Sequence, residues 1–502
     1  MPIKKIDDAA KMEQRIRGRY ISNLMLMIWQ SRKHLQSAFD LKTMKGQQGY
    51  LDWCDVALIR PPDRLFYAQL LGAAGKKPGV FRWLPSWLRR FANRIRFKLR
   101  VQAARFTAMK NQPENPPIEK TNFDRPAAAA PKIEGVPGAN LVGYADAELG
   151  LGEHVRMSGA AFAQTDVAFG IFNFGIGTES RRQARLRHGS PIASNIHKAN
   201  LFHISPDQML TAFGHLGREF FSDRYNIGYW LWELSKCPDE WLPVMGFVDE
   251  IWAPSRFIQR AFAERTDLPV KYMPLCVTLP SPEGRSRESF GLPKDRYLFL
   301  FSFDFFSFID RKNPFAVIAA FKRAFPDIGT KVGLAIKTMN GDVRHPRWKH
   351  MLELVADDPR IVVLNRTMTR DEVIGLFDVC DSFVSLHRSE GFGFGPAEAM
   401  SLGKPVIATN YSGNTDFTLP DNSCPVDYKL VPVTEGQYIF DRGQVWADPD
   451  IEHAAWYMRK LASESAYGAE LGKRAAAFMR ENHGPAKIGS LYRKRLKELN
   501  LA

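Results

Sequence analysis

Cysteine is scarce in this sequence and never occurs at the spacing of a metal or redox site. The 502 residues include five cysteines, an odd number with no Cys-x-x-Cys pair: Cys54, Cys237, Cys276, Cys380 and Cys424. A disulfide framework or a zinc site is therefore not expected, and a reducing cytosol fits best. Long apolar runs and the apolar core of a signal peptide are also missing, which predicts a cytoplasmic protein without a membrane span.

Acidic residues are absent from one long segment. Residues 76–110 contain eleven Lys or Arg residues and no Asp or Glu, in a chain whose net charge is +15. Apolar residues recur there at helical spacing, and Trp83 and Trp87 lie near the start of the segment. A basic helix of this kind can bind an anionic membrane surface, which would place the protein peripherally at the inner face of the cytoplasmic membrane. Alternatively, the apolar stripe packs on the rest of the protein. Nucleic acid is not an expected partner, because no recognition motif is visible.

The length and patterning of the chain predict several structural units. A chain of 502 residues is too long for a single core. Strands alternate with helical segments from about residue 139, which predicts parallel sheets with helices on both faces. The expected divisions are a basic helical extension at 1–110, a Pro- and Ala-rich linker at 111–135, α/β domains at 136–285 and 290–450, and C-terminal helices at 451–502.

The most informative stretch places two carboxylates on either side of a glycine-rich turn. Residues 381–387 are expected to form a buried strand, and residues 396–402 a helix with proline in its first turn. Three glycines lie between them: Gly391, Gly393 and Gly395. They let the turn approach a ligand, and the helix N-terminus offers free amides to an anion. Glu390 and Glu398 can then accept hydrogen bonds from different hydroxyls of one polyhydroxylated ligand, such as a nucleotide sugar.

The stretch Glu-Gly-Phe-Gly-x-x-x-x-Glu-Ala-Met-x-x-Gly-Lys-Pro-Val-Ile-Ala-Thr, from residue 390, resembles the nucleotide-binding signature of retaining glycosyltransferases of family 4. The resemblance implies an α/β protein of GT-B architecture. Two Rossmann-like, doubly wound parallel-sheet domains would face a cleft, with the basic helical extension in front and the C-terminal helices returning to the first domain. It also implies that Glu398 binds ribose and Glu390 the donor sugar. The further donor-binding candidates are Gly391, Gly393, Phe394, Gly395, Gly413 and Asn414.

A basic dipeptide precedes a predicted helix in the second domain. Arg311 and Lys312 stand before Asn313, a suitable N-cap. A departing nucleoside diphosphate needs cations near its β-phosphate, so both residues are catalytic candidates. Lys312 resembles the lysine that relatives use there. Many relatives also carry an arginine directly after the first strand, where this chain has Phe305 and Phe306, and Arg311 could substitute for it.

The first α/β domain also contains candidate site residues. Gly150 and Gly152 follow the first strand and resemble the glycine-rich loop that faces the donor phosphates, although a simple tight turn would look the same. His203 ends a strand and is a catalytic candidate that could bond the donor sugar or orient the acceptor; a core or helix-capping histidine is the alternative. Glu233 follows an aromatic strand, at about the place where relatives carry a polar residue on the acceptor side.

These features predict hexosyl transfer from a nucleoside-diphosphate sugar to an acceptor hydroxyl, with retention, in polysaccharide or glycolipid synthesis. The expected partners are the nucleotide sugar and a glycan or lipid-linked acceptor. The lead-in to Glu390 and the segment around Lys312 resemble bacterial polysaccharide mannosyltransferases, which favours GDP-mannose. No cofactor is expected, and no metal, because no Asp-x-Asp motif accompanies the phosphate site. The alternatives are a sugar-nucleotide epimerase of similar fold and a non-catalytic scaffold that binds nucleotide sugars or membranes.

Overall fold

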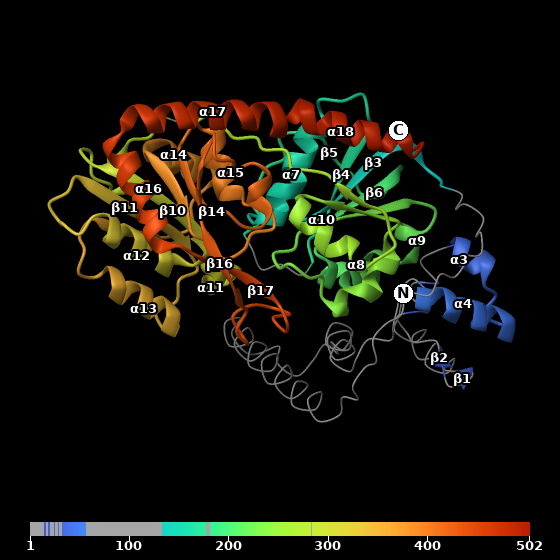
Figure 1. The fold of residues 1–502 in the computed structure, drawn as a ribbon. Helices are drawn as coiled ribbons and strands as arrows, with labels where there is room; N and C mark the ends of the chain where they lie inside the picture. Colours follow the sequence, from blue (N-terminus) through green and yellow to red (C-terminus); the bar gives the residue numbers. More distant parts are fainter. Residues whose placement is uncertain are drawn as a thin grey trace, which may run out of the picture.

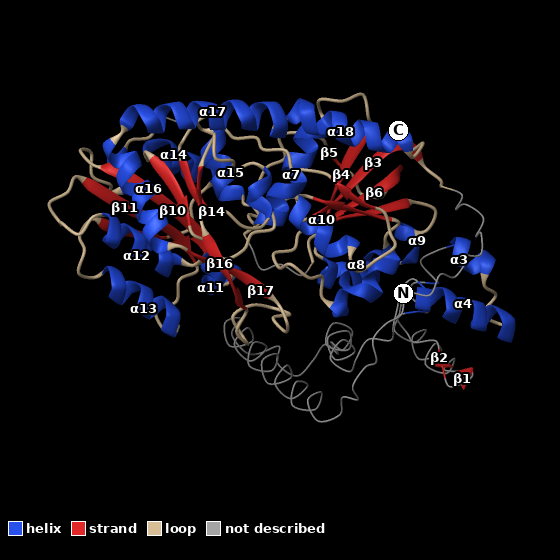
Figure 2. Ribbon diagram, in the orientation of Figure 1, coloured by secondary structure: helices blue, strands red, loops and turns tan. Residues whose placement is uncertain are grey.

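The computed structural model describes residues 15–16, 19–20, 25, 29, 33–56, 133–176, 181–282 and 284–502. Within them the chain forms two parallel sheets, each flanked by helices (Figure 1 and Figure 2). The basic segment 76–110, with its predicted membrane contact, and nearly all of the predicted linker 111–135 lie outside the described residues.

The first sheet has seven parallel strands in the order β5-β4-β3-β6-β7-β8-β9. Its strands are β3 (Val136–Gly143), β4 (Phe169–Asn173), β5 (Ser190–Pro191), β6 (His197–His203), β7 (Tyr225–Tyr229), β8 (Glu250–Ala253) and β9 (Val270–Tyr272). The α-helices between them are α7 (Gly150–Phe162), α8 (Met209–Leu216), α9 (Arg218–Phe221) and α10 (Arg256–Ala263). Helices cover both faces, so Leu141, Leu201 and Ile227 on the central strands are fully buried.

The second sheet has six parallel strands in the order β12-β11-β10-β13-β14-β15. These are β10 (Tyr297–Asp304), β11 (Val332–Met339), β12 (Ile361–Asn365), β13 (Ser382–Ser385), β14 (Val406–Thr409) and β15 (Cys424–Val426). Its helices are α11 (Ile309–Lys312), α12 (Pro314–Ala324), α13 (Pro346–Val355), α14 (Arg370–Val379) and α15 (Phe394–Ser401). An antiparallel hairpin, β16 (Tyr428–Pro432) and β17 (Val445–Pro449), follows this sheet.

Both sheets reverse their strand order at their first strand. The chain builds outward from β3 in one direction and then continues from β6 in the other; β10 and β13 form the same kind of switch in the second sheet. In open parallel sheets, ligands bind beyond the carboxyl ends of the strands at such a switch point. The segments that follow β10 and β13 are therefore where a site is expected, and they contain Arg311, Lys312 and Glu390.

Three C-terminal helices tie the domains together: α16 (Ile451–Ser463), α17 (Ser465–His483) and α18 (Pro485–Glu498). In Figure 1, α17 runs along the second domain and α18 continues over the first. The buried carboxylate of Glu250 accepts a hydrogen bond from Arg495 Nε at 2.9 Å, and the hydroxyls of Tyr229 and Tyr492 lie 3.1 Å apart. These contacts fix α18 on the first sheet.

The described part of the N-terminal extension is not helical throughout, so that prediction is wrong in part. Helices α3 (Lys33–Ala38) and α4 (Met44–Val56) are present, but Arg15–Ile16 (β1) pairs antiparallel with Arg19–Tyr20 (β2). Across all the residues that the structure describes, no helix is both long and apolar enough to cross a membrane.

Candidate functional site

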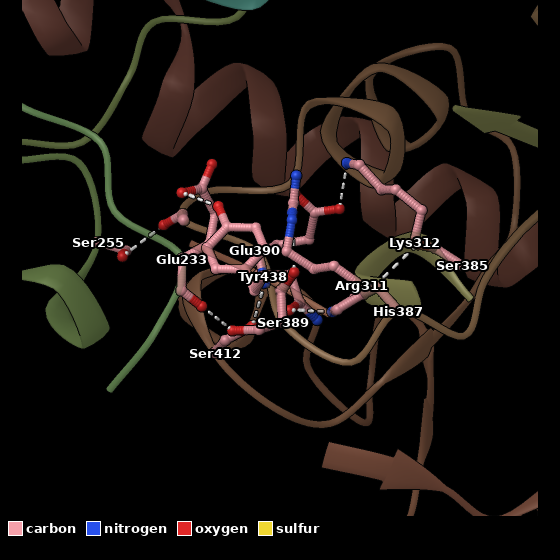
Figure 3. Close-up of polar contacts among 12 residues, drawn as sticks. Glu233, Ser255, Arg311, Lys312, Ser385, His387, Ser389, Glu390, Ser412 and Tyr438 are labelled. Carbon is pink, nitrogen blue, oxygen red and sulfur yellow. Dashed lines mark hydrogen bonds and ion pairs between the residues drawn. The ribbon is translucent and has the colours of Figure 1, made fainter. Parts of the chain in front are cut away.

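The site centres on one buried carboxylate that contacts two cations (Figure 3). Arg311 NH1 donates to Glu390 Oε2 at 3.1 Å, and Lys312 Nζ donates to Glu390 Oε1. Arg311 NH1 also donates to the carbonyl of Ser389 at 2.9 Å. All three charged groups come from the segments beyond β10 and β13, at the switch point of the second sheet.

Local structure explains why the two cations lie there. Arg311 and Lys312 end the short helix α11, and Asn313 adopts a left-handed conformation with φ of 54° that starts α12 in a new direction. The Asn313 side chain caps α12 through Ala316 N and donates to the carbonyl of Leu386 at 3.0 Å. This second bond attaches the basic dipeptide to the strand end that leads to Glu390.

The electrostatics of the cluster favour an ionised Glu390. Burial, with 8% of the residue exposed, raises the pKa of this carboxyl, but Lys312 and Arg311 outweigh burial and hold the pKa at about 2. The same carboxylate raises the pKa of Arg311 against the opposing effect of burial. Glu390 is therefore a hydrogen-bond acceptor throughout the physiological pH range.

The glycine-rich turn allows a close approach of two backbone segments. Gly393 has φ of +100° and precedes α15, a conformation that L side chains rarely adopt. A Cβ atom on Gly413 would lie 1.9 Å from the carbonyl oxygen of Gly391, and the Gly413 amide donates to the carbonyl of Glu390 at 2.9 Å. Ser412 Oγ accepts from the Glu390 amide at 2.8 Å. The turn after β14 thus fixes the backbone of Glu390.

Asn414 and His387 form a buried network behind Glu390. Asn414 Oδ1 lies 2.9 Å from His387 Nε2, while its Nδ2 donates to the carbonyl of Thr409 and to Thr418 Oγ1. Both polar ends of Asn414, predicted to bind the donor, are thus engaged inside the protein. The Gly413 amide is likewise paired with Glu390 and not directed at a ligand.

The other glycines and the aromatic residue of the predicted donor site have packing roles in the structure. A Cβ on Gly391 would lie 2.9 Å from the Trp232 carbonyl oxygen, and one on Gly395 would lie 2.8 Å from the Phe383 ring. Phe394 begins α15, and its ring contacts Phe392. These residues bring the start of α15 against both β13 and the first domain.

Glu398 does not join the basic dipeptide. It is 6% exposed on α15, and its Oε1 lies 2.7 Å from Arg370 NH1 at the start of α14. Arg370 NH2 lies 3.6 Å from Glu153 Oε1, which belongs to α7 of the first domain. The sequence interpretation missed Arg370 and Glu153. The available signal was a cation at the first helical position of a capped helix, where the helix dipole disfavours positive charge.

The first domain reaches the cluster through Glu233. Tyr438, from the segment that joins β16 to β17, donates from its hydroxyl to Glu233 Oε2 at 2.9 Å, and Arg311 lies over its ring at 5.6 Å. Ser389 Oγ donates to the Glu233 carbonyl. Figure 3 shows Glu233, Tyr438 and the Arg311–Glu390 pair grouped together. Sequence reasoning singled out Glu233 but not Tyr438.

The remaining first-domain candidates are His203, Gly150 and Gly152. His203 is fully buried, and its ring contacts those of His154 and Tyr229; neither ring nitrogen has a hydrogen-bond partner. Burial lowers the pKa of His203 to about 3, so the ring is neutral. Gly152 allows close packing, because a Cβ there would lie 2.3 Å from the Ala147 carbonyl oxygen, whereas Gly150 has open space around it.

Two Rossmann-like parallel-sheet domains joined by C-terminal helices have the GT-B architecture, which confirms the predicted fold. Residues 283–477 match the family model described as "Glycosyl transferases group 1". The match spans the second parallel-sheet domain and extends into α17. No curated protein matches the sequence.

Solved structures share the fold at low sequence identity. Sucrose-phosphate synthase from Thermosynechococcus elongatus is 15% identical with a TM-score of 0.54, covering 72% of this chain and 99% of its own. HepE from Anabaena, in complex with UDP and glucose, is 13% identical with a TM-score of 0.52, covering 72% of this chain and 100% of its own. TarM from S. aureus is 13% identical with a TM-score of 0.44 over 60% of this chain; the chain spans about half of that protein, 55%.

Proposed function

We propose that the protein transfers a hexosyl group from a nucleoside-diphosphate sugar to an acceptor hydroxyl, with retention at the anomeric carbon. The observation that carries this proposal is the pairing of Glu390 with Arg311 and Lys312 at the switch point of the second sheet. In the part of the chain that the structure describes, both cations contact the same carboxylate, that of Glu390, so they retain donors for an anionic ligand. HepE, which has the same fold, was solved with UDP and glucose, in agreement with a nucleotide-sugar donor.

In the proposed reaction, the bond between the anomeric carbon and a β-phosphate oxygen breaks. The acceptor oxygen forms the new bond on the same face of the sugar, and its proton leaves with the diphosphate. The transition state resembles an oxocarbenium ion. Lys312 and Arg311 stabilise the charge that develops on the diphosphate, and Glu390 accepts hydrogen bonds from sugar hydroxyls rather than attacking the sugar as a nucleophile. The other carboxylate of the motif, Glu398, would bind the ribose.

The test measures the rate of sugar transfer by the purified protein. The Lys312→Ala variant is compared with the Lys322→Ala variant. Loss of one cation at the leaving group should lower kcat about 10²- to 10³-fold. Lys322 is a matched control, because its ammonium pairs with Asp357 at 2.6 Å on the surface of α12. Equal activity of the two variants would contradict the assigned role of Lys312. Interconversion of nucleotide sugars without an acceptor would favour the epimerase alternative, and binding without turnover the scaffold.

We also propose a particular donor base, donor sugar and acceptor. The sequence around Lys312 and before Glu390 favours GDP-mannose, and a glycan or lipid-linked sugar is the proposed acceptor. A thermal-shift screen of UDP-, GDP-, ADP- and dTDP-sugars tests the donor; stabilisation by another sugar nucleotide alone would replace GDP-mannose. We expect transfer to persist in EDTA, because Arg311 and Lys312 take the place of a metal ion at the diphosphate.

The basic segment 76–110 is proposed to hold the enzyme at an anionic membrane, where a lipid-linked acceptor would lie. Its eleven cations would each contribute about 1 kcal/mol near such a surface. Co-sedimentation with anionic and with neutral vesicles at low salt tests this. Equal recovery with both kinds of vesicle would remove the membrane role and leave packing on the protein as the explanation.

A further inference from the structure

Arg370 links Glu398 to the first domain. It is the first residue of α14, and its NH1 lies 2.7 Å from Glu398 Oε1 on α15. Its NH2 lies 3.6 Å from Glu153 Oε1 on α7, across the boundary between the domains. Glu153 is itself held by Arg156, whose NH2 lies 2.7 Å away. One guanidinium therefore lies between carboxylates of both domains.

Helix stability does not explain an arginine at this position. The start of α14 already has a capping box, in which Thr369 and Glu372 satisfy each other's backbone amides. Positive charge at a helix N-terminus opposes the helix dipole, so Arg370 costs the helix free energy instead of stabilising it. The contacts with Glu398 and Glu153 therefore explain why an arginine occupies this position.

The Arg370 guanidinium has N–H groups that are not used in hydrogen bonds. Arg370 Nε and NH2 are both buried and have no hydrogen-bond partner, since the 3.6 Å separation from Glu153 is too long for a hydrogen bond. Buried donors without partners are rare and costly in folded proteins. Glu398, with only one oxygen in contact with Arg370, also retains acceptor capacity for a hydroxyl. The pair is thus charged and incompletely bonded, and 30% of the Arg370 side chain is exposed.

We propose that Arg370 is a positioning residue for the nucleotide: it keeps Glu398 ionised and oriented to accept hydrogen bonds from the ribose hydroxyls of a nucleoside diphosphate. This inference rests on the proposed function and adds a residue to its donor site. Its contact with Glu153 makes the geometry of the ribose site depend on how the first domain is docked.

The charges around Glu398 support this role. Burial raises the pKa of Glu398, and the negative charge of Glu153 raises it further. The positive charges of Arg370 and of Lys337 on β11 lower the pKa. Lys337 is 7% exposed and also interacts with Asp304 of β10. Without Arg370, the pKa of Glu398 would rise further. A protonated carboxyl donates one hydrogen bond and accepts less well, so it would bind two hydroxyls poorly.

The experiment compares binding of a nucleoside diphosphate with binding of its 2′,3′-dideoxy analogue. UDP, GDP, ADP and dTDP are tried first, and the ribonucleotide that binds the wild-type protein most tightly is paired with its dideoxy form, since dTDP already lacks the 2′-hydroxyl. In the wild type the ribose hydroxyls should strengthen binding about 10- to 100-fold, as hydrogen bonds to charged groups do. In Arg370→Gln this preference should largely vanish at neutral pH, and the pH at which affinity falls in acid should move upward.

Two further variants make the result interpretable. Arg370→Lys retains the charge and should restore most of the hydroxyl preference and the pH profile. Arg323→Gln makes the same charge change at an exposed pair with Glu452 and should behave as wild type. If Arg370→Gln keeps both the preference and the pH profile, the positioning role is wrong while the proposed function stands. If the wild type binds none of the four nucleotides, the proposed function fails, and this inference fails with it.

Discussion

The hydroxyl of Tyr438 in the second domain donates a hydrogen bond to the Glu233 carboxylate in the first, with 2.9 Å between Oη and Oε2. Burial and the negative charge of Glu233 raise the pKa of Tyr438 well above its usual value, so the phenol remains a donor. The ring also contacts Phe308 edge-on and lies under the Arg311 guanidinium. One side chain thus connects the first domain to the cation that contacts Glu390.

Replacing Tyr438 with phenylalanine removes the interdomain bond but keeps the ring. We expect the free energy of unfolding to fall by about 1–3 kcal/mol, the cost of leaving a charged group without its partner. Transfer should weaken as well, because Arg311 loses a neighbour whose position the bond fixed. Urea denaturation and initial rates measure both effects. Tyr428→Phe is the control, since Tyr428 is 37% exposed on the same hairpin. If the two variants have the same free energy of unfolding and the same initial rate, the Tyr438–Glu233 bond contributes to neither stability nor activity.

Gly413 should not tolerate a side chain. The Cβ of alanine would overlap the carbonyl oxygen of Gly391 at 1.9 Å, and this oxygen is a backbone atom that cannot rotate away as a side chain could. Gly413→Ala should therefore displace the turn, weaken the amide bond to Glu390 and lower both Tm and activity. Gly214→Ala is a matched control, because nothing lies within 4 Å of its Cβ position inside α8 and alanine favours a helix there. Similar Tm values for both variants would refute the close approach.

The Glu390 pKa predicts a specific acid sensitivity. The pKa is about 2 in the folded protein and 4.5 in the reference state, so the native state binds its proton less readily. The resulting stability is present above the reference pKa and is lost as pH falls toward the folded pKa. It amounts to on the order of 3 kcal/mol.

Glu390→Gln lacks this titration and should be less stable than the wild type at neutral pH. Unfolding in urea at a series of pH values from 7 down to 3 measures the difference between the two proteins. That difference should narrow below about pH 4.5, where the wild type begins to lose the contribution of its carboxylate. A difference that stays constant over this range would mean that Glu390 titrates normally.

The sequence predicted the sheets and the carboxylate turn because these depend on local patterns. Buried parallel strands are continuous apolar runs, as in residues 297–304, and the spacing of Glu390 and Glu398 follows from a turn and one helix. The partners of these carboxylates were harder to assign. Lys312 was recognisable from its place before an N-cap, but Glu398 meets Arg370 through the packing of α14 against α15.

Contacts between the domains could not be predicted from the sequence. Glu233 and Tyr438 are 205 positions apart, and their contact depends on how two separately patterned domains dock. The hairpin that carries Tyr438 was also missed, since β16 is mostly exposed and lacks the regular alternation of a half-buried strand. His203 shows the reverse case, because its place at a strand end suggested a ligand contact while its ring is enclosed by His154 and Tyr229.

Glu250 should be essential for docking of the C-terminal helix on the first domain. Its fully buried carboxylate accepts from Arg495 on α18 and from Trp252 Nε1 at 2.8 Å. Glu250→Gln leaves Arg495 paired with Glu498 on its own helix at 2.8 Å, so loss of the buried carboxylate should cost about 1–3 kcal/mol. Asp166→Asn is the control: Asp166 pairs with Arg493 on the same helix at 2.5 Å, but 57% of its side chain is exposed. Thermal unfolding should show a large drop in Tm for the first variant and no measurable change for the second, because water screens an exposed pair. If the two variants unfold at the same temperature, burial of the Glu250 pair is not what holds α18 in place.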